Sequence, residues 1–221
     1  MVRARPHLTL MLALTFSTGV IDAVGYLGFD RVFSGNMTGN VVLLGMGLAG
    51  ANGLPIVRPA LALLGFLVGA VLGGRVLGPT PKGTWTTRTT VLLVLVTAGL
   101  LGSAIIAALP GTPSHAVLGA ATTTLLAVAM GMQAAAARRL AVADVTTVVV
   151  TSTIVGLAAD SRLAGGTGEA WGRRILAIVL IVLGAFVGAL TLYISLWLGI
   201  AVTVAVTLSV AILGHRLRES E

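Results

Sequence analysis

The stretch "FDRVFSGNMTGNVVLLGMGLAG", residues 29–50, decides how this chain is organised. It is apolar enough for a membrane, yet it holds two asparagines, a threonine and five glycines, which weaken a helix. Irregular backbone survives within a bilayer only where protein buries it or where it lines a wet cavity. We therefore expect a short polar piece here, between better hydrophobic spans.

The composition indicates an all-α polytopic membrane protein, with residues 1–221 as one integral membrane domain. Of the 221 residues, 57% are hydrophobic and 10% are charged, and the mean hydropathy is +1.04; soluble domains carry about 25% charged residues. Cysteine is absent, which excludes disulfides and thiolate chemistry. The three histidines form no cluster or triad, so we expect no catalytic residues, no metal, no cofactor and no enzyme. The net charge of +7 fits basic loops on one side of a membrane, not nucleic acid.

The hydropathy pattern predicts six long spans. The hydrophobic stretches are residues 8–29, 60–77, 89–109, 116–137 and 175–214. A crossing needs about 20 residues, so the last stretch is two helices, with a turn near Tyr193, Ser195 and Trp197.

Two further segments, residues 34–50 and 143–159, are short and polar. A helix over residues 36–50 would be about 22 Å long, against a hydrocarbon core of about 30 Å. They are either re-entrant or broken helices beside six spans, or they bring the total to eight short spans.

The basic residues favour six spans. With the N-terminus inside, only Arg31 and Arg58 fall outside, as the positive-inside rule requires. The inside group is Arg3, Arg5, Arg75, Lys82, Arg88, Arg138, Arg139, Arg162, Arg173, Arg174, Arg216 and Arg218. Eight spans would scatter them over both sides. Both termini are therefore expected in the cytoplasm.

Weak internal similarity suggests a repeat with halves at approximately residues 8–110 and 114–214. "NMTGNVVLLGMGLA" loosely matches "VVTSTIVGLA", and "GFLVGAVLG" resembles "GAFVGALT". Three spans per half would place the halves in opposite orientations, a plan frequent in transporters, with the site near the midplane. We expect residues 36–40 and 151–153 to meet there.

Two stretches, "GVIDAVGYLGFDRVFSGNMTGNVVLLG" and "MGMQAAAARRLAVADVTTVVVTSTIVGLAAD", carry a resemblance. They resemble the YoaK-like family of bacterial membrane proteins, and the likeness covers nearly the whole chain. The resemblance implies a multi-pass protein of the bacterial inner membrane and supplies no substrate. Ser152 follows Thr151 where the family pattern often has glycine, which loosens the parallel with Thr38 and Gly39.

Asp22 is the most informative single residue, because an acid inside a span costs a few kcal/mol unless it is paired, protonated or wet. It is either a proton carrier or cation ligand, or a structural partner of a hydrogen bond or of Arg31 or Arg58. Asn36, Thr38 and Asn40 bring amide and hydroxyl groups that can replace a solute's hydration shell. Ser34 or Asn36 can cap a helix that begins there. The alternative is a turn of small residues that pack helices together.

The second polar segment has its own candidates. Gln133 precedes it as a neutral counterpart of Asp22, or as a plain interhelical hydrogen bonder. Thr151 and Thr153 either line a path or bond back to their own helix. Asp144 is expected to be a helix N-cap.

Two classes of function remain. The first is a membrane transporter or channel for a small polar or ionic solute, with proton coupling through Asp22 as one form. The second is a non-transporting assembly protein or an integral membrane enzyme. The expected partners are the lipid bilayer and the solute, and a homo-oligomer is left open.

Overall fold

The computed structural model describes residues 5–51, 53–112, 114–140 and 150–219, and within these ranges the ordered elements are helical. The helices are α1 (Arg5–Gly28), α2 (Met37–Leu48), α3 (Val57–Leu77), α4 (Thr87–Ala107), α5 (Ala116–Leu140), α6 (Val150–Ala159), the 3-10 turn η1 (Arg162–Ala164), α7 (Trp171–Thr191) and α8 (Leu196–Glu219). Six of them are long and apolar enough to cross a membrane. The expected fold class is confirmed, including the turn between α7 and α8.

The long helices extend beyond the hydrophobic stretches that predict them. α7 begins at Trp171 and includes Arg173 and Arg174, and α5 continues through Arg138 and Arg139. Arginine can lay its aliphatic stem along apolar surface and keep its charge in water, so basic residues at a span's end need not terminate the helix.

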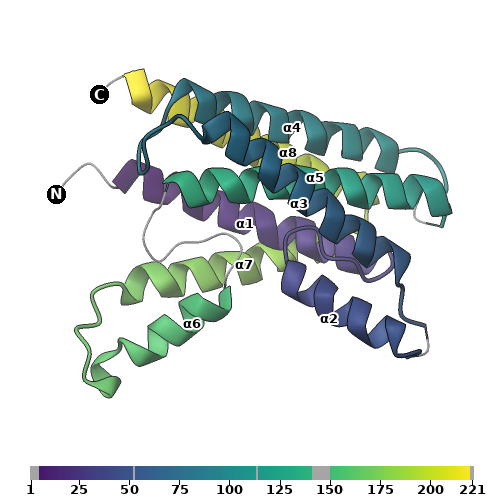
Figure 1. Ribbon diagram of the computed structural model, residues 1–221, viewed down its shortest axis with the longest axis horizontal. Coiled ribbons are helices and arrows are strands. Elements are labelled where there is room, and N and C mark those ends of the chain that lie inside the picture. The colour runs from purple at the N-terminus through teal and green to yellow at the C-terminus, as the bar shows by residue number, and fades with distance from the viewer. Residues whose placement is uncertain (1–4, 52, 113, 141–149, 220–221) are drawn as a thin grey trace.

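The short helices α2 and α6 do not cross the molecule. They hold 12 and 10 residues, which corresponds to about 18 and 15 Å of helix. α2 begins at mid-length and runs to the end where α3 starts, whereas α6 runs to the opposite end, where α7 starts (Figure 1). The alternative of eight short spans is therefore wrong for this structure.

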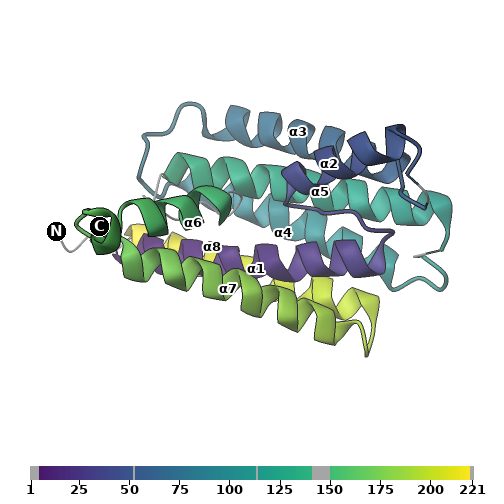
Figure 2. The same ribbon diagram turned by 90° about the horizontal axis from the view of Figure 1, so that it is seen from below.

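The helix contacts have the symmetry of a two-fold repeat. If each helix of α1–α4 is exchanged with the helix four places later in α5–α8, the α1–α7 contact becomes the α5–α3 contact. In the same exchange the α4–α5 contact becomes the α8–α1 contact. The α2–α3 and α6–α7 contacts exchange in the same way, while α1–α5 and α4–α8 map onto themselves. Figure 2 shows α1 beside α7 and α3 beside α5. Since α1 and α5 touch on the symmetry axis, that crossing joins the two halves.

Glycines fix the register of this repeat. A side chain at Gly19 of α1 would strike the backbone of α7, and one at Gly131 of α5 would strike the backbone of α3. Gly69 and Gly184 stand at the matching positions on the partner helices, facing Val128 and Phe16. In the structure Gly69 is therefore the counterpart of Gly184. The sequence similarity had aligned Gly65 with Gly184, one helical turn away.

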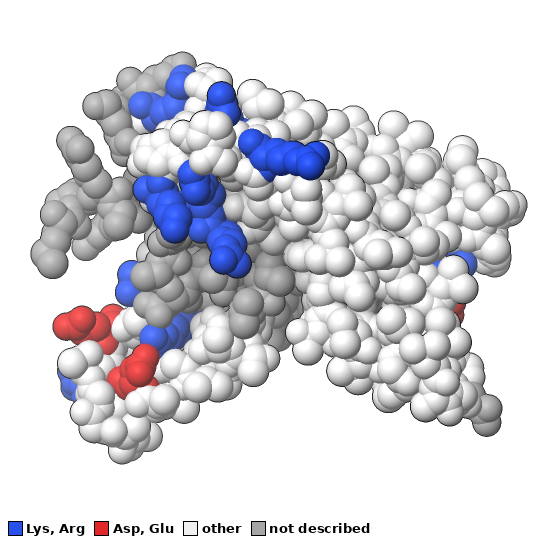
Figure 3. Space-filling model, in the orientation of Figure 1, with Lys and Arg blue, Asp and Glu red and all other residues white. Residues whose placement is uncertain are grey.

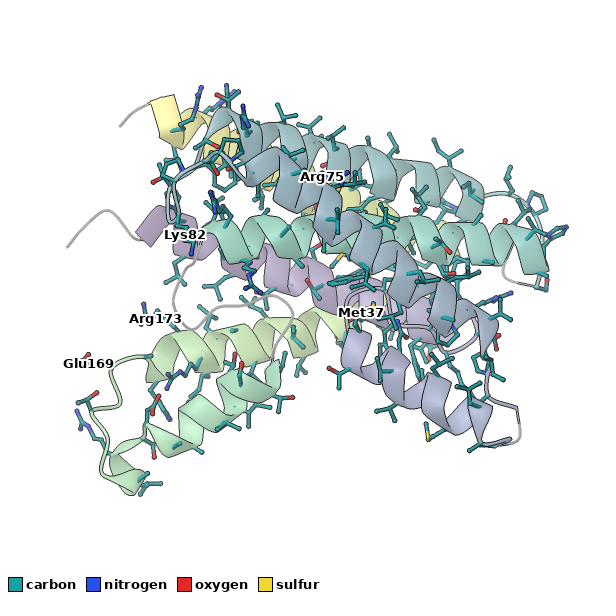
Figure 4. All side chains as sticks on the ribbon, viewed as in Figure 1. Met37, Arg75, Lys82, Glu169 and Arg173 are labelled. Carbon is teal, nitrogen blue, oxygen red and sulfur yellow. The ribbon has the colours of Figure 1, made fainter. Side chains whose placement is uncertain are left out.

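Positive charge gathers at one end of the molecule. Lysine and arginine side chains cluster at the end where both termini lie, and the far end shows little charge (Figure 3). Lys82 and Arg173 lie toward this basic end, while Met37, at the start of α2, lies near mid-length (Figure 4). The loops that carry most of the basic residues therefore lie at one end of the molecule, as the six-span model requires.

Candidate functional site

A sharp turn after α1 sends the chain back along the protein. Asp30 and Arg31 have φ of 61° and 60°, the left-handed region that non-glycine residues rarely adopt. Arg31 N–H donates to the carbonyl of Tyr26, which ties this turn to the last turn of the helix. The backbone then runs back beside α1 until Met37, where α2 begins.

Asp22 holds this returning loop in place. Its Oδ1 accepts hydrogen bonds from three consecutive backbone N–H groups, those of Ser34 (3.0 Å), Gly35 (2.7 Å) and Asn36 (3.3 Å). The carboxylate therefore occupies the anion position just before a helix N-terminus, where N–H groups and the helix dipole both favour negative charge. Among the described residues its partners are these N–H groups, and no ion pair joins it to Arg31 or Arg58.

Two asparagines close the loop from the other side. Asn36 is the N-cap of α2, and its side chain accepts from Gly39 N–H, as the capping expectation states. Asn40 is fully buried. Its Oδ1 accepts from Phe33 N–H (2.9 Å), and its Nδ2 donates to Phe33 C=O (2.6 Å). The Asn40 amide is thus committed to the loop backbone.

Gly35 lets the loop approach the α1–α5 crossing. A Cβ at this position would lie 3.1 Å from Thr18 Cγ2, 3.3 Å from Met130 Cε and 3.5 Å from Asp22 Oδ1. Thr18 and Asp22 are one helical turn apart on the same face of α1. Gln133 of α5 donates from Nε2 to Thr18 Oγ1 at 3.3 Å, and Thr18 in turn donates to the carbonyl of Leu14. Thr18 therefore contacts both the returning loop and Gln133, one helical turn from Asp22.

Polar atoms in this region are buried without a protein partner. Gln133 and Ser34 are both 0% exposed, and neither Gln133 Oε1 nor Ser34 Oγ has a hydrogen bond in the part of the chain that the structure describes. A buried amide oxygen of this kind costs free energy unless something donates to it. These atoms are therefore the candidate ligand contacts of the site.

The remaining candidate residues lie elsewhere. Thr38 is exposed in the first turn of α2, and Thr151 is exposed in α6, whereas Thr153 is buried there. The expected N-cap Asp144 falls outside the described residues.

The expected meeting of residues 36–40 with residues 151–153 is wrong for the described structure. α2 packs on α3 and α6 packs on α7 and η1, and the two short helices do not touch. Each short helix packs on the long helix that follows it, and the two run to opposite ends. The groups that meet at the crossing are on α1 and α5 instead.

Gln133 is not the counterpart of Asp22. The register set by Gly19 and Gly131 aligns Asp22 with Ala134. The site is therefore asymmetric, with a carboxylate in the first half only. Thr18 was not predicted as a site residue. It connects Gln133 to the face of α1 that carries Asp22, and its position one helical turn before Asp22 was the signal in the sequence.

The fold and this site define a class: a multi-pass α-helical membrane protein with two symmetry-related halves and a polar site at their crossing. The chain belongs to a family of membrane proteins of unknown function, DUF1275, whose model matches residues 10–213. It is similar to the UPF0700 transmembrane protein YoaK of Bacillus subtilis (strain 168), with 29% identity over 195 residues, covering 82% of each chain. No solved structure matches it.

Proposed function

We propose that this protein is a transporter or channel for a small polar or ionic solute in the bacterial inner membrane, with both termini in the cytoplasm. The observation that carries the proposal is Asp22, the only acidic residue within the six long spans. Asp22 lies beside the contact of the two halves and next to the start of α2. The loop before α2 enters the protein, and α2 returns to the end from which the loop came. Symmetry-related halves with a broken or re-entrant helix at a midplane site are a frequent plan among transporters.

The chemistry of the site supports a path for a polar solute. Gln133 Oε1 and Ser34 Oγ are buried without partners, next to a loop whose backbone is satisfied by Asp22 and Asn40. A protein that needed these groups only for packing would gain stability from apolar side chains of similar volume. Thr38 and Thr151, exposed on the two short helices, are proposed to line the route to and from the site.

Proton coupling through Asp22 is part of the proposal. A proton on Asp22 would weaken three hydrogen bonds that depend on a carboxylate acceptor, and so would loosen the returning loop. A pH gradient should then drive uptake in the natural protein but not in Asp22→Asn.

The test is solute flux in proteoliposomes, followed by light scattering after an osmotic step with a panel of small solutes. We expect flux above that of empty liposomes, reduced at least tenfold in Asp22→Asn. Asp30→Asn is the matched control, because Asp30 is exposed and asparagine can adopt the same left-handed backbone conformation in the turn. The competing proposal, a non-transporting assembly protein or integral membrane enzyme, predicts that Asp22→Asn changes stability and that neither protein moves solute.

A further inference from the structure

We infer that the solute bound between Asp22, Ser34 and Gln133 is a small monovalent cation, an alkali ion or ammonium. This inference rests on the proposed transport function and names the solute class of the same site. The inference rests on two observations: which hydrogen-bonding groups at the site already have protein partners, and which have none.

Five backbone N–H groups around the start of α2 are already used. The N–H groups of Ser34, Gly35 and Asn36 bond to Asp22, and that of Met37 bonds to the carbonyl of Gly35. The side chain of Asn36 takes the N–H of Gly39. An anion that bound here as at other helix N-termini would have to displace the Asp22 carboxylate. The carboxylate of Asp22 thus competes with an anion for these donors and repels it.

The groups left over can accept hydrogen bonds. Gln133 Oε1 has no hydrogen, Ser34 Oγ is a hydroxyl, and Asp22 Oδ2 takes part in none of the hydrogen bonds that the structure describes. Oxygen acceptors of this kind replace the hydration shell of a cation, or receive the N–H groups of ammonium. The Ser34 hydroxyl and the second N–H of Gln133 Nε2 can also donate, but the negative charge of Asp22 nearby disfavours an anion.

The charge of the site fits a single positive charge. Asp22 is the only acid within the six spans, and the described residues hold no group of three His, Cys, Asp or Glu side chains that could bind a metal ion. Ca²⁺ and Mg²⁺ are usually bound by several oxygens that include more than one charge, or keep much of their water. One carboxylate with neutral oxygens suits a monovalent ion.

The absence of a side chain at Gly35 lets the loop lie close to Thr18 and Asp22. The missing Cβ lies within 3.5 Å of both Thr18 and Asp22, and Thr18 holds Gln133 through Nε2. The amide of Gln133 is thereby oriented with Oε1 as its free end. Gln133 is a specificity-determining residue in this arrangement, and Thr18 is a positioning residue.

The experiment compares the natural protein with Asp22→Asn, Gln133→Met and Asp30→Asn. Flux into proteoliposomes is measured for K⁺, Na⁺ and ammonium, for chloride and formate, and for glycerol and urea. We expect flux of one or more of the cations only, lowered at least tenfold by Asp22→Asn and at least threefold by Gln133→Met, and unchanged by Asp30→Asn. The separate cation arms distinguish an alkali ion from ammonium.

A second measurement does not depend on flux. Thermal unfolding in detergent is followed in NaCl, KCl or NH₄Cl against N-methyl-D-glucamine chloride at equal ionic strength. We expect a rise in Tm from one small cation that is lost in Gln133→Met and kept in Asp30→Asn. Folding of each variant is checked by the same transition.

The outcomes separate the two proposals. Asp22-dependent flux of an anion or a neutral solute would overturn the cation inference and leave the transport function standing. A cation-specific rise in Tm without flux would support the site and overturn transport. Neither flux nor a cation-specific rise in Tm would overturn both.

Discussion

Gly35 N–H donates a 2.7 Å hydrogen bond to Oδ1 of Asp22, thirteen residues earlier in the chain. This bond joins a membrane-spanning helix to the loop that re-enters the protein beside it. It places a charged acceptor at the start of α2, and it brings a glycine without a side chain against the α1–α5 crossing. The site and the loop are therefore one structure, and a change in either should affect the other.

Gly35→Ala should reduce transport more than stability. The added methyl group would lie 3.1 Å from Thr18 and 3.3 Å from Met130, close enough to displace the loop slightly beside Asp22, although the flexible end of Met130 can move. We expect a flux reduced at least fivefold and a loss of unfolding free energy of about 1 kcal/mol. Gly45→Ala in α2, where nothing lies within 4 Å, is the control and should keep full flux.

Asn40→Leu should destabilise the loop strongly. The substitution keeps a similar volume but leaves the N–H and C=O of Phe33 without the partners that Asn40 provides. Buried groups left unpaired in this way cost about 2–4 kcal/mol together. Thermal or detergent-induced unfolding measures the loss. Thr38→Val, at an exposed position of the same helix, should be near neutral in stability. Equal stability of the two variants would contradict the role given to Asn40.

Gly69→Ala and Gly74→Ala should have opposite effects within one helix. A methyl group at Gly69 would overlap the backbone of Val128 in α5, whereas nothing lies within 4 Å of Gly74. The first should cost about 1–3 kcal/mol through forced separation of α3 and α5. The second should be neutral or gain up to about 1 kcal/mol in helix propensity. The unfolding transitions of the two variants provide the comparison, and a loss at both would mean that α3 has a different register.

Arg174→Lys should loosen the end of α6. Arg174 donates from Nη1 to the carbonyl of Gly156 (2.5 Å) and pairs with Asp160 (2.7 Å). Lysine keeps the charge but lacks the planar fork that reaches both acceptors. The ion pair contributes little because Asp160 is 61% exposed, so the carbonyl bond dominates, at about 1–2 kcal/mol. Hydrogen exchange of α6 should quicken about tenfold, and Arg162→Lys, which alters an exposed arginine nearby, should not change it.

Labelling of single cysteines tests the orientation. The chain has no cysteine, so Lys82→Cys, Thr167→Cys and Ser114→Cys each introduce one thiol at an exposed position. We expect an impermeant maleimide to label only Ser114→Cys in intact cells and to label all three in broken cells. Labelling of Lys82→Cys from outside would reverse the orientation proposed from the basic residues.

The sequence predicted those features that depend on local composition. Membrane spans follow from runs of apolar residues because the hydrocarbon layer has a fixed thickness. The sequence predicted an N-cap at Ser34 or Asn36, since a cap bonds to backbone only a few residues away, and the structure has it at Asn36. The internal repeat was predicted from weak sequence similarity, and the glycine contacts pair Gly69 with Gly184, one helical turn from that alignment.

Only the tertiary structure decided which groups meet at the site. The sequence showed that Asp22 was costly in a membrane, but its partners lie 12 to 14 residues later in a loop whose path depends on the left-handed turn at Asp30 and Arg31. The sequence also favoured a meeting of the two short polar helices, because both are polar and short. Helix packing instead brings Thr18 and Gln133 together, 115 residues apart. Hydropathy is a sum over neighbouring residues, so the sequence predicts the spans directly. A contact such as that of Thr18 with Gln133 depends on how two glycine-lined helices pack against each other, which neither segment determines alone.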